Sequence, residues 1–197
     1  KKKIIFSIVG ARPHFIKAAP FLREMKNSDY QVYNIHTGQH YDNNMSGIFF
    51  DELNLPEPDV NLGVRSGSHA SQTAAVMKNV ESLIIDLKPE AVVIYGDTNT
   101  TLRSALASSK LYIPTIHIEA GVRCHDKGYP EEINRIIGDV PYLAIDHFGL
   151  SVNISKETHK LDFSDFWLLN RGDVNHYTVE ANQTVAKAVI DKVEQIC

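Results

Sequence analysis

The sequence predicts an α/β protein built on a doubly wound parallel sheet. Short apolar runs rich in β-branched residues, such as Ile4–Val9 and Ala91–Tyr95, are typical of parallel strands buried on both faces. Amphipathic segments separate these runs, and that alternation predicts βαβ units. The chain shows no internal repeat, and 197 residues suffice for one large domain. We therefore expect a single domain over residues 1–197.

The first half of the chain alternates strands with helices. The expected elements are strand Ile4–Val9, helix Phe15–Met25, strand Gln31–His36, helix Asn44–Leu53, a connection at Pro56–Ser68 and helix Ala70–Leu87. The helices are assigned from apolar residues at helical spacing, and the strands from continuous apolar runs. Pro20 lies inside the first helix, so we expect either a kink there or a helix that begins near this proline.

The second half continues the pattern. The expected elements are strand Ala91–Tyr95, helix Thr100–Ser109, strand Ile113–Ile118, a helix from Pro130, strand Tyr142–Leu150, a short helix capped by Ser155, strand Phe166–Asn170 and helix Tyr177–Ile196. Proline at a first helical position and serine at an N-cap both favour helix starts. Strands separated by helices of this length again imply a doubly wound parallel sheet.

Composition and charge exclude several classes of protein. The 43% hydrophobic and 22% charged content is that of an ordinary soluble domain. A net charge of −4 gives no general attraction to nucleic acid or to an anionic membrane. No apolar run approaches the roughly 18 residues of a membrane span, and Lys1–Val9 lacks the cleavage site of a signal peptide. The cysteines, Cys124 and Cys197, form no metal or disulfide pattern, which fits a cytoplasmic location.

Three acidic residues follow strand ends or open a helix. Asp97 and Glu119 each come just after a predicted strand, and Glu131 lies in the first turn of a predicted helix. Ligands of open α/β sheets bind at the carboxyl ends of the strands, so these carboxylates are candidates for acid–base chemistry. Each also has a simpler interpretation. Asp97 could be an N-cap, Glu119 could accept hydrogen bonds from loop amides, and Glu131 could pair with Arg135 four residues on.

Two cations, Arg12 and Lys17, flank the start of the first helix. Helix N–H groups and cations together favour a phosphate or a carboxylate, although two solvated surface cations would give the same pattern. The segment is neither a Walker loop nor a Gly-x-Gly-x-x-Gly fingerprint.

His117-x-Glu119 is similar to part of a zinc deaminase site, but the required Pro-Cys-x-x-Cys is missing. We therefore expect no metal.

Five motifs together resemble the non-hydrolysing UDP-N-acetylglucosamine 2-epimerase family over residues 1–146. They are Gly10-Ala11-Arg12-Pro13-His14-Phe15-Ile16-Lys17, Thr37-Gly38-Gln39-His40, Tyr95-Gly96-Asp97-Thr98, His117-Ile118-Glu119-Ala120-Gly121-Val122-Arg123 and Pro130-Glu131-Glu132-Ile133-Asn134-Arg135. The resemblance implies a glycosyltransferase-B-like architecture of two Rossmann-like domains with the active site between them. It implies that residues 1–197 supply only the amino-terminal domain and that the second domain is absent.

The resemblance also implies a function. Members of the family are nucleotide-sugar isomerases of polysaccharide biosynthesis. They interconvert UDP-GlcNAc-type and UDP-ManNAc-type sugars by eliminating and re-adding UDP, and they use no cofactor. The positions that match the family's proton-transfer residues are Asp97, Glu119 and Glu131, and those that match its substrate and phosphate contacts are Arg12, Lys17 and Arg135. The implied partners are a UDP-sugar and either a second copy or another chain that completes the cleft.

Two departures from the common motifs bear on the substrate. His14 replaces a glutamate, and Gly128-Tyr129-Pro130 replaces Trp-Pro. Both resemble the branch that acts on UDP-2,3-diacetamido-glucuronic acid. One alternative function is a catalytically incomplete domain that binds sugar nucleotide or docks on a partner, and a weaker one is a hydrolysing relative. We expect little or no turnover from the isolated chain.

Overall fold

The computed structural model describes residues 2–38, 55–64, 67–120, 124–138 and 143–145. The described elements are β1 (Lys3–Val9), α1 (Arg12–Met25), β2 (Tyr30–His36), β3 (Val60–Asn61), α3 (His69–Leu87), β4 (Ala91–Tyr95), α4 (Asn99–Lys110), β5 (Thr115–Ile118), α5 (Pro130–Gly138) and β6 (Leu143–Ile145). The elements expected at Asn44–Leu53, near Ser155, at Phe166–Asn170 and at Tyr177–Ile196 lie outside the described residues. Within the described ranges, no helix combines the length and the apolar character that crossing a bilayer requires.

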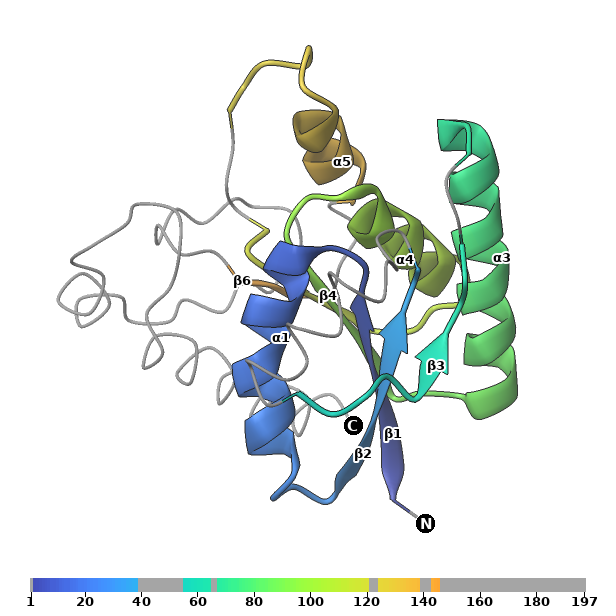
Figure 1. The fold of residues 1–197 in the computed structure, drawn as a ribbon, viewed down its shortest axis with the longest axis vertical. Helices are drawn as coiled ribbons and strands as arrows, with labels where there is room; N and C mark the ends of the chain where they lie inside the picture. Colours follow the sequence, from blue (N-terminus) through green and yellow to red (C-terminus); the bar gives the residue numbers. More distant parts are fainter. Residues whose placement is uncertain (1, 39–54, 65–66, 121–123, 139–142, 146–197) are drawn as a thin grey trace, which may run out of the picture.

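The strands form one six-stranded parallel sheet in the order β3-β2-β1-β4-β5-β6 (Figure 1). The chain builds outward from β1 to β3, returns to β4 on the other side of β1, and then continues to β6. The prediction of a doubly wound parallel sheet is thus confirmed. The point where the strand order reverses lies between β1 and β4, and ligands of such sheets bind beside it at the carboxyl ends.

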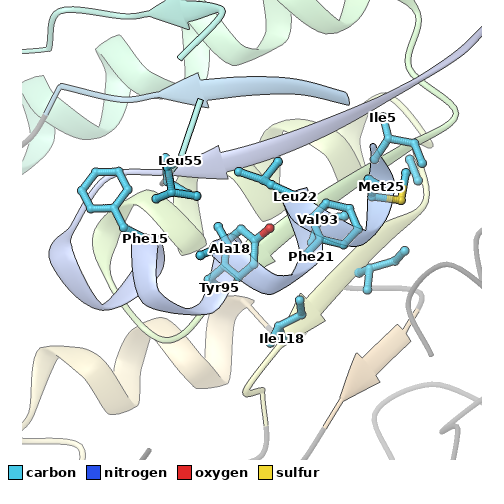
Figure 2. Close-up of a cluster of buried hydrophobic side chains, with 14 of the residues drawn as sticks. Ile5, Phe15, Ala18, Phe21, Leu22, Met25, Leu55, Val93, Tyr95 and Ile118 are labelled. Atoms are coloured by element: carbon cyan, nitrogen blue, oxygen red, sulfur yellow. The ribbon is translucent and has the colours of Figure 1, made fainter. Parts of the chain in front are cut away.

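Alternate residues of the central strands supply two separate cores, because successive side chains of a strand point to opposite faces. Ile5 and Val9 of β1 pack with α1 on one face, where Figure 2 shows Ile5 near Met25 of α1. Phe6 and Ile8 pack with α3 and α4 on the other face. A register shift of one residue would exchange the two sets, so the buried pattern fixes where each strand ends. The two layers of helices therefore hold the strand ends in a defined order.

Two elements differ from expectation. α1 begins at Arg12 and continues through Pro20, so it does not begin near that proline. Its start follows from Pro13, which is preorganised for the first helical turn, while Pro20 itself is buried in the α1 core. The segment expected to be a connection contains β3, where Val60 pairs with Ile35. A strand of two residues carries no periodic signal that a sequence pattern could show.

The end of α3 gives a first testable prediction. Lys88 caps this helix in the left-handed conformation, with φ +50°, and its side chain is exposed. Glycine adopts this conformation without the Cβ clash, so Lys88→Gly should raise the free energy of unfolding by about 0.5–1 kcal/mol. The matched control is Lys78→Gly in the middle of the same helix, which should lower it by about 1 kcal/mol. Urea unfolding measures both changes. A loss of stability in Lys88→Gly would contradict the left-handed conformation assigned to Lys88.

Candidate functional site

The loops after β1 and β2 and the first turn of α4 meet through very close contacts at the carboxyl edge of the sheet. A Cβ atom on Gly10 would lie 2.2 Å from Oγ1 of Thr100 and 2.4 Å from Oγ1 of Thr37. The two threonine hydroxyls lie 3.0 Å apart and share a hydrogen bond. Only glycine allows the end of β1 to approach the first turn of α4 this closely. This contact sets the distance between the β1 and β4 loops.

Glu119 and Lys17 form an ion pair at this edge, and each side chain is 12% exposed. Glu119 is the first residue after β5, and its φ of +66° is in the left-handed region. That conformation is unfavourable for a residue with a side chain, and such strain clusters at functional sites. Gly96 lies next to the pair, since a Cβ atom there would be 3.6 Å from Lys17 Nζ and 3.9 Å from Glu119 Oε2. The loops after β4 and β5 therefore present this ion pair together with the first helix.

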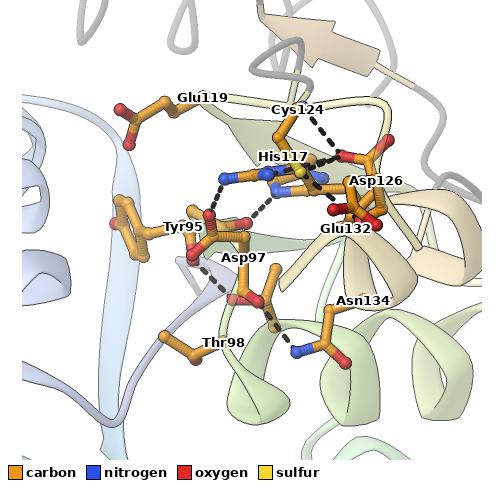
Figure 3. A network of polar contacts seen from close by, with 12 residues as sticks. Tyr95, Asp97, Thr98, His117, Glu119, Cys124, Asp126, Glu132 and Asn134 are labelled. Carbon is orange, nitrogen blue, oxygen red and sulfur yellow. Dashed lines mark hydrogen bonds and ion pairs between the residues drawn. The ribbon is translucent and has the colours of Figure 1, made fainter. Parts of the chain in front are cut away.

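A second charged cluster surrounds Arg135 on α5, and Figure 3 shows its acidic members Asp97 and Glu132. Arg135 Nη2 forms an ion pair with the Asp97 carboxylate, and Nη1 lies 3.4 Å from Glu132 Oε2. Glu132 is 1% exposed, and the same oxygen accepts a hydrogen bond from the backbone N–H of Cys124 at 3.1 Å. The guanidinium thus links the β4 loop to the start of α5. Two helices, α1 and α5, and the loops after β4 and β5 therefore contribute charge to one edge of the sheet.

Ion pairs in the structure join Asp97 with Arg135 and Glu119 with Lys17, all of them predicted site residues. Arg12 is the first residue of α1 and is exposed. Glu131 is also exposed, in the first turn of α5. The N-cap residue of α4 is Thr98, so Asp97 does not cap that helix.

Glu132 is a residue that sequence reasoning missed. It is buried and contacts Arg135 three residues on, whereas the sequence pattern favoured the exposed Glu131, four residues before the arginine. Both spacings place two side chains on one side of a helix. The i, i+3 spacing was therefore the available signal, but it could not be separated from the i, i+4 spacing by pattern alone.

Residues 23–162 match the family model described as UDP-N-acetylglucosamine 2-epimerase. The chain belongs to the UDP-N-acetylglucosamine 2-epimerase family. A homolog of this epimerase from Methanococcus maripaludis is 51% identical over 135 residues, which are 68% of this chain and 38% of the relative. The UDP-2,3-diacetamido-2,3-dideoxy-D-glucuronate 2-epimerase of Pseudomonas aeruginosa is 46% identical over 136 residues, with the same two shares. This member of the family thus spans about two fifths of the length of these curated relatives.

Solved structures of the epimerase family share the fold. The Methanocaldococcus jannaschii UDP-GlcNAc 2-epimerase, in complex with UDP-GlcNAc and UDP, is 43% identical with a TM-score of 0.71. The match covers 73% of this chain and 40% of that one. MurG of Acinetobacter baumannii is 17% identical with a TM-score of 0.55 and is similar in fold alone. The predicted family and the Rossmann-like half of a glycosyltransferase-B fold are both confirmed.

Two buried histidines lie beside the charged groups at this edge of the sheet. The N–H of Gly10 donates to His14 Nδ1 at 3.2 Å, so Nε2 carries the proton and can donate to the Thr98 hydroxyl at 3.2 Å. Burial, and next the charge of Lys17, lower the pKa of His14 to about 3. His117 donates from Nε2 to the carbonyl of Gly96, and burial lowers its pKa to about 4. Both rings are therefore neutral near pH 7 and hold the β4 loop by hydrogen bonds.

These histidines predict a loss of stability in acid. The unfolded chain binds protons on both rings near pH 6.5, whereas the folded chain does so only near pH 3–4, so the unfolded state gains protons first. Their contribution is therefore complete above about pH 6.5 and should fall by up to about 1.4 kcal/mol per pH unit for each histidine below it. Urea unfolding between pH 7.5 and 4.5 measures the slope. His14→Gln should remove about half of this pH dependence. An unchanged slope would contradict the lowered pKa of His14.

Proposed function

We propose that this chain supplies the sugar-binding acid–base groups of a UDP-sugar 2-epimerase. The reaction interconverts UDP-GlcNAc-type and UDP-ManNAc-type sugars. The single observation that supports this most is the pair of carboxylate–cation contacts, Glu119 with Lys17 and Asp97 with Arg135, at the switch-point edge of the sheet. A similar protein is described in complex with UDP-GlcNAc and UDP, which supports a UDP-sugar as the ligand.

The chemistry requires both kinds of charge. A carboxylate removes the proton at C2 of the sugar, and the electrons of that C–H bond form a C1–C2 double bond while the C1–O bond to UDP breaks. The products of this half-reaction are a 2-acetamidoglucal and UDP. A carboxylic acid then returns a proton to C2 on the opposite face, and UDP adds back to C1. No electron leaves the substrate overall, so acid–base groups and charge stabilisation are sufficient.

The proposed roles follow from position. Asp97, Glu119 and Glu131 are the proposed proton-transfer residues. The buried side of Glu132 is committed to Arg135 and to the Cys124 amide, so it is assigned to positioning. Lys17 and Arg135 place positive charge where the leaving diphosphate becomes more negative, and Arg12 at the start of α1 is a further proposed phosphate contact.

The partner is part of the same proposal. The charged groups described here occupy one edge of one sheet. We expect a second copy or another chain to supply the opposite wall of the site. Exchange by the chain alone should therefore be far slower than the roughly 1–10³ s⁻¹ of typical enzymes.

The test is incubation with UDP-sugars in D₂O at stoichiometric protein over several hours, which detects slow exchange. Deuterium at C2 of recovered UDP-GlcNAc or UDP-ManNAc, read by NMR and mass spectrometry, is the expected result. A UDP-2,3-diacetamido-glucuronic acid substrate in the same panel distinguishes the two kinds of relative. Binding measured by calorimetry without any deuterium would favour the alternative of a sugar-nucleotide-binding domain. The absence of both deuterium exchange and UDP-sugar binding would contradict the proposal.

A further inference from the structure

The orientation of α5 is opposite to that of an ordinary amphipathic helix. Its apolar residues Ile133, Ile136 and Ile137 are 40–46% exposed. Its polar residues Glu132, Asn134 and Arg135 are at most 9% exposed and lie against the β4–α4 loop and the Cys124 backbone. Burial of apolar surface usually decides which face of a helix points inward. Polar contacts decide it here, and such a departure from the local pattern is expected at functional sites.

Asn134 contacts the backbone of Asp97, whereas Arg135 contacts its side chain. Its Nδ2 donates to the backbone carbonyl of Asp97 at 2.9 Å (Figure 3). The same nitrogen lies 3.3 Å from Oδ1 of Asn99. Both N–H groups of the amide are therefore directed to one short segment, the junction of β4 and α4. The residue is 7% exposed, so water competes little for these hydrogen bonds. Asn134 is therefore hydrogen-bonded to the backbone of the residue that carries the Asp97 carboxylate.

Two consecutive residues of α5 thus contact one residue in two ways. Arg135 pairs with the Asp97 carboxylate, and Asn134 binds the Asp97 carbonyl. A guanidinium can exchange a carboxylate for a diphosphate, because both offer oxygen acceptors to its fork of donors. The side-chain amide of Asn134 carries no charge, so the negative charge of a diphosphate attracts it less than it attracts the guanidinium. The Asn134 contact can persist while the Arg135 contact changes.

We infer that Asn134 is a positioning residue that holds the Asp97 carboxylate in place while Arg135 is drawn to the leaving diphosphate, a role which rests on the proposed function. Its hydrogen bonds to the Asp97 carbonyl and to Asn99 keep the β4–α4 junction fixed when the ion pair loosens. Asn134 touches neither the sugar nor the phosphate in this role. It acts through the backbone, so its loss should impair the chemical step more than substrate binding.

The first test compares Asn134→Ala, Asn134→Gln and the control Ile133→Ala, whose side chain is 41% exposed on the outward face of the same helix. Asn134→Ala should lower C2 exchange at saturating UDP-GlcNAc by about 10-fold or more and change half-saturation by less than about threefold. Asn134→Gln keeps both amide donors and should recover part of the rate, while Ile133→Ala should match wild type. Equal loss in rate and in folded fraction, measured by circular dichroism, would overturn the positioning role.

A second measurement does not depend on substrate. Backbone hydrogen exchange of Gly96–Asn99 should be about 10-fold faster or more in Asn134→Ala, while exchange at the end of β5 stays unchanged. Unchanged protection of Gly96–Asn99 would overturn the inference whatever the turnover. A wild-type chain without C2 exchange, together with a loosened β4–α4 junction in the variant, would overturn the proposed function and leave this structural role of Asn134 standing.

Discussion

Glu119→Gln is expected to lower deuterium exchange at C2 by about 100-fold or more, because glutamine keeps the shape of the side chain but cannot accept a proton. The strained backbone of Glu119 aims its carboxylate at Lys17, and both side chains are largely shielded from water. Affinity for UDP-GlcNAc should change much less than the exchange rate, since the lost interaction belongs to the transition state. Exchange in D₂O and calorimetry on the same preparation measure the two effects.

The matched control for this substitution is Glu90→Gln. Glu90 is exposed and comes just before β4, at the opposite end of the strand from Asp97. The Glu90→Gln variant should catalyse deuterium exchange at C2 at the wild-type rate. Retention of more than about a tenth of the wild-type rate by Glu119→Gln would contradict a role in proton transfer, because general acid–base groups contribute about 10²–10⁴-fold.

Arg135→Met is expected to destabilise the fold by about 3–5 kcal/mol, since removing one partner of a buried ion pair leaves the other charge uncompensated. Glu132 is 1% exposed and would lose the guanidinium that lies 3.4 Å from its carboxylate. Asp97 would lose its ion pair as well, although it is partly exposed and contributes less. Urea unfolding at pH 7.5 measures the change.

Two further variants separate charge from packing at this position. Arg135→Met combined with Glu132→Gln should recover part of the lost stability, because the buried negative charge is then removed too. Lys127→Met, an exposed residue of the preceding loop, should change stability by less than about 0.5 kcal/mol. A loss below about 1 kcal/mol in Arg135→Met would show that the cluster does not depend on the guanidinium.

The sheet and the positions of its strand ends could be predicted because the signals were local. Continuous apolar runs ended at Gly10, Gly96 and Glu119, and all three end at the carboxyl edge as expected. The burial of Glu132 in place of Glu131 could not be predicted. Neighbouring residues of a helix differ by about 100° in direction, and the apolar pattern of α5 would have turned its isoleucines inward.

The contacts that complete the site also lacked a sequence signal. Neither the left-handed conformation of Glu119 nor the two hydrogen bonds of Asn134 follows from spacing, because each depends on how distant loops meet. The direction of Arg135 toward Asp97 has the same cause, since 38 residues separate them. The motif resemblance predicted candidate residues, and the packing of α1, α4 and α5 at the strand ends determines which of them touch.

The most direct test of the site is the mapping of amide chemical shifts during titration of the ¹⁵N-labelled chain with UDP-GlcNAc. The structure predicts that the largest changes occur at Gly10, Gly96 and Glu119, whose loops surround the two ion pairs at the carboxyl edge. Changes confined to the opposite edge of the sheet, around Glu90 or Lys88, would contradict the placement of the substrate and with it the roles assigned to the carboxylates.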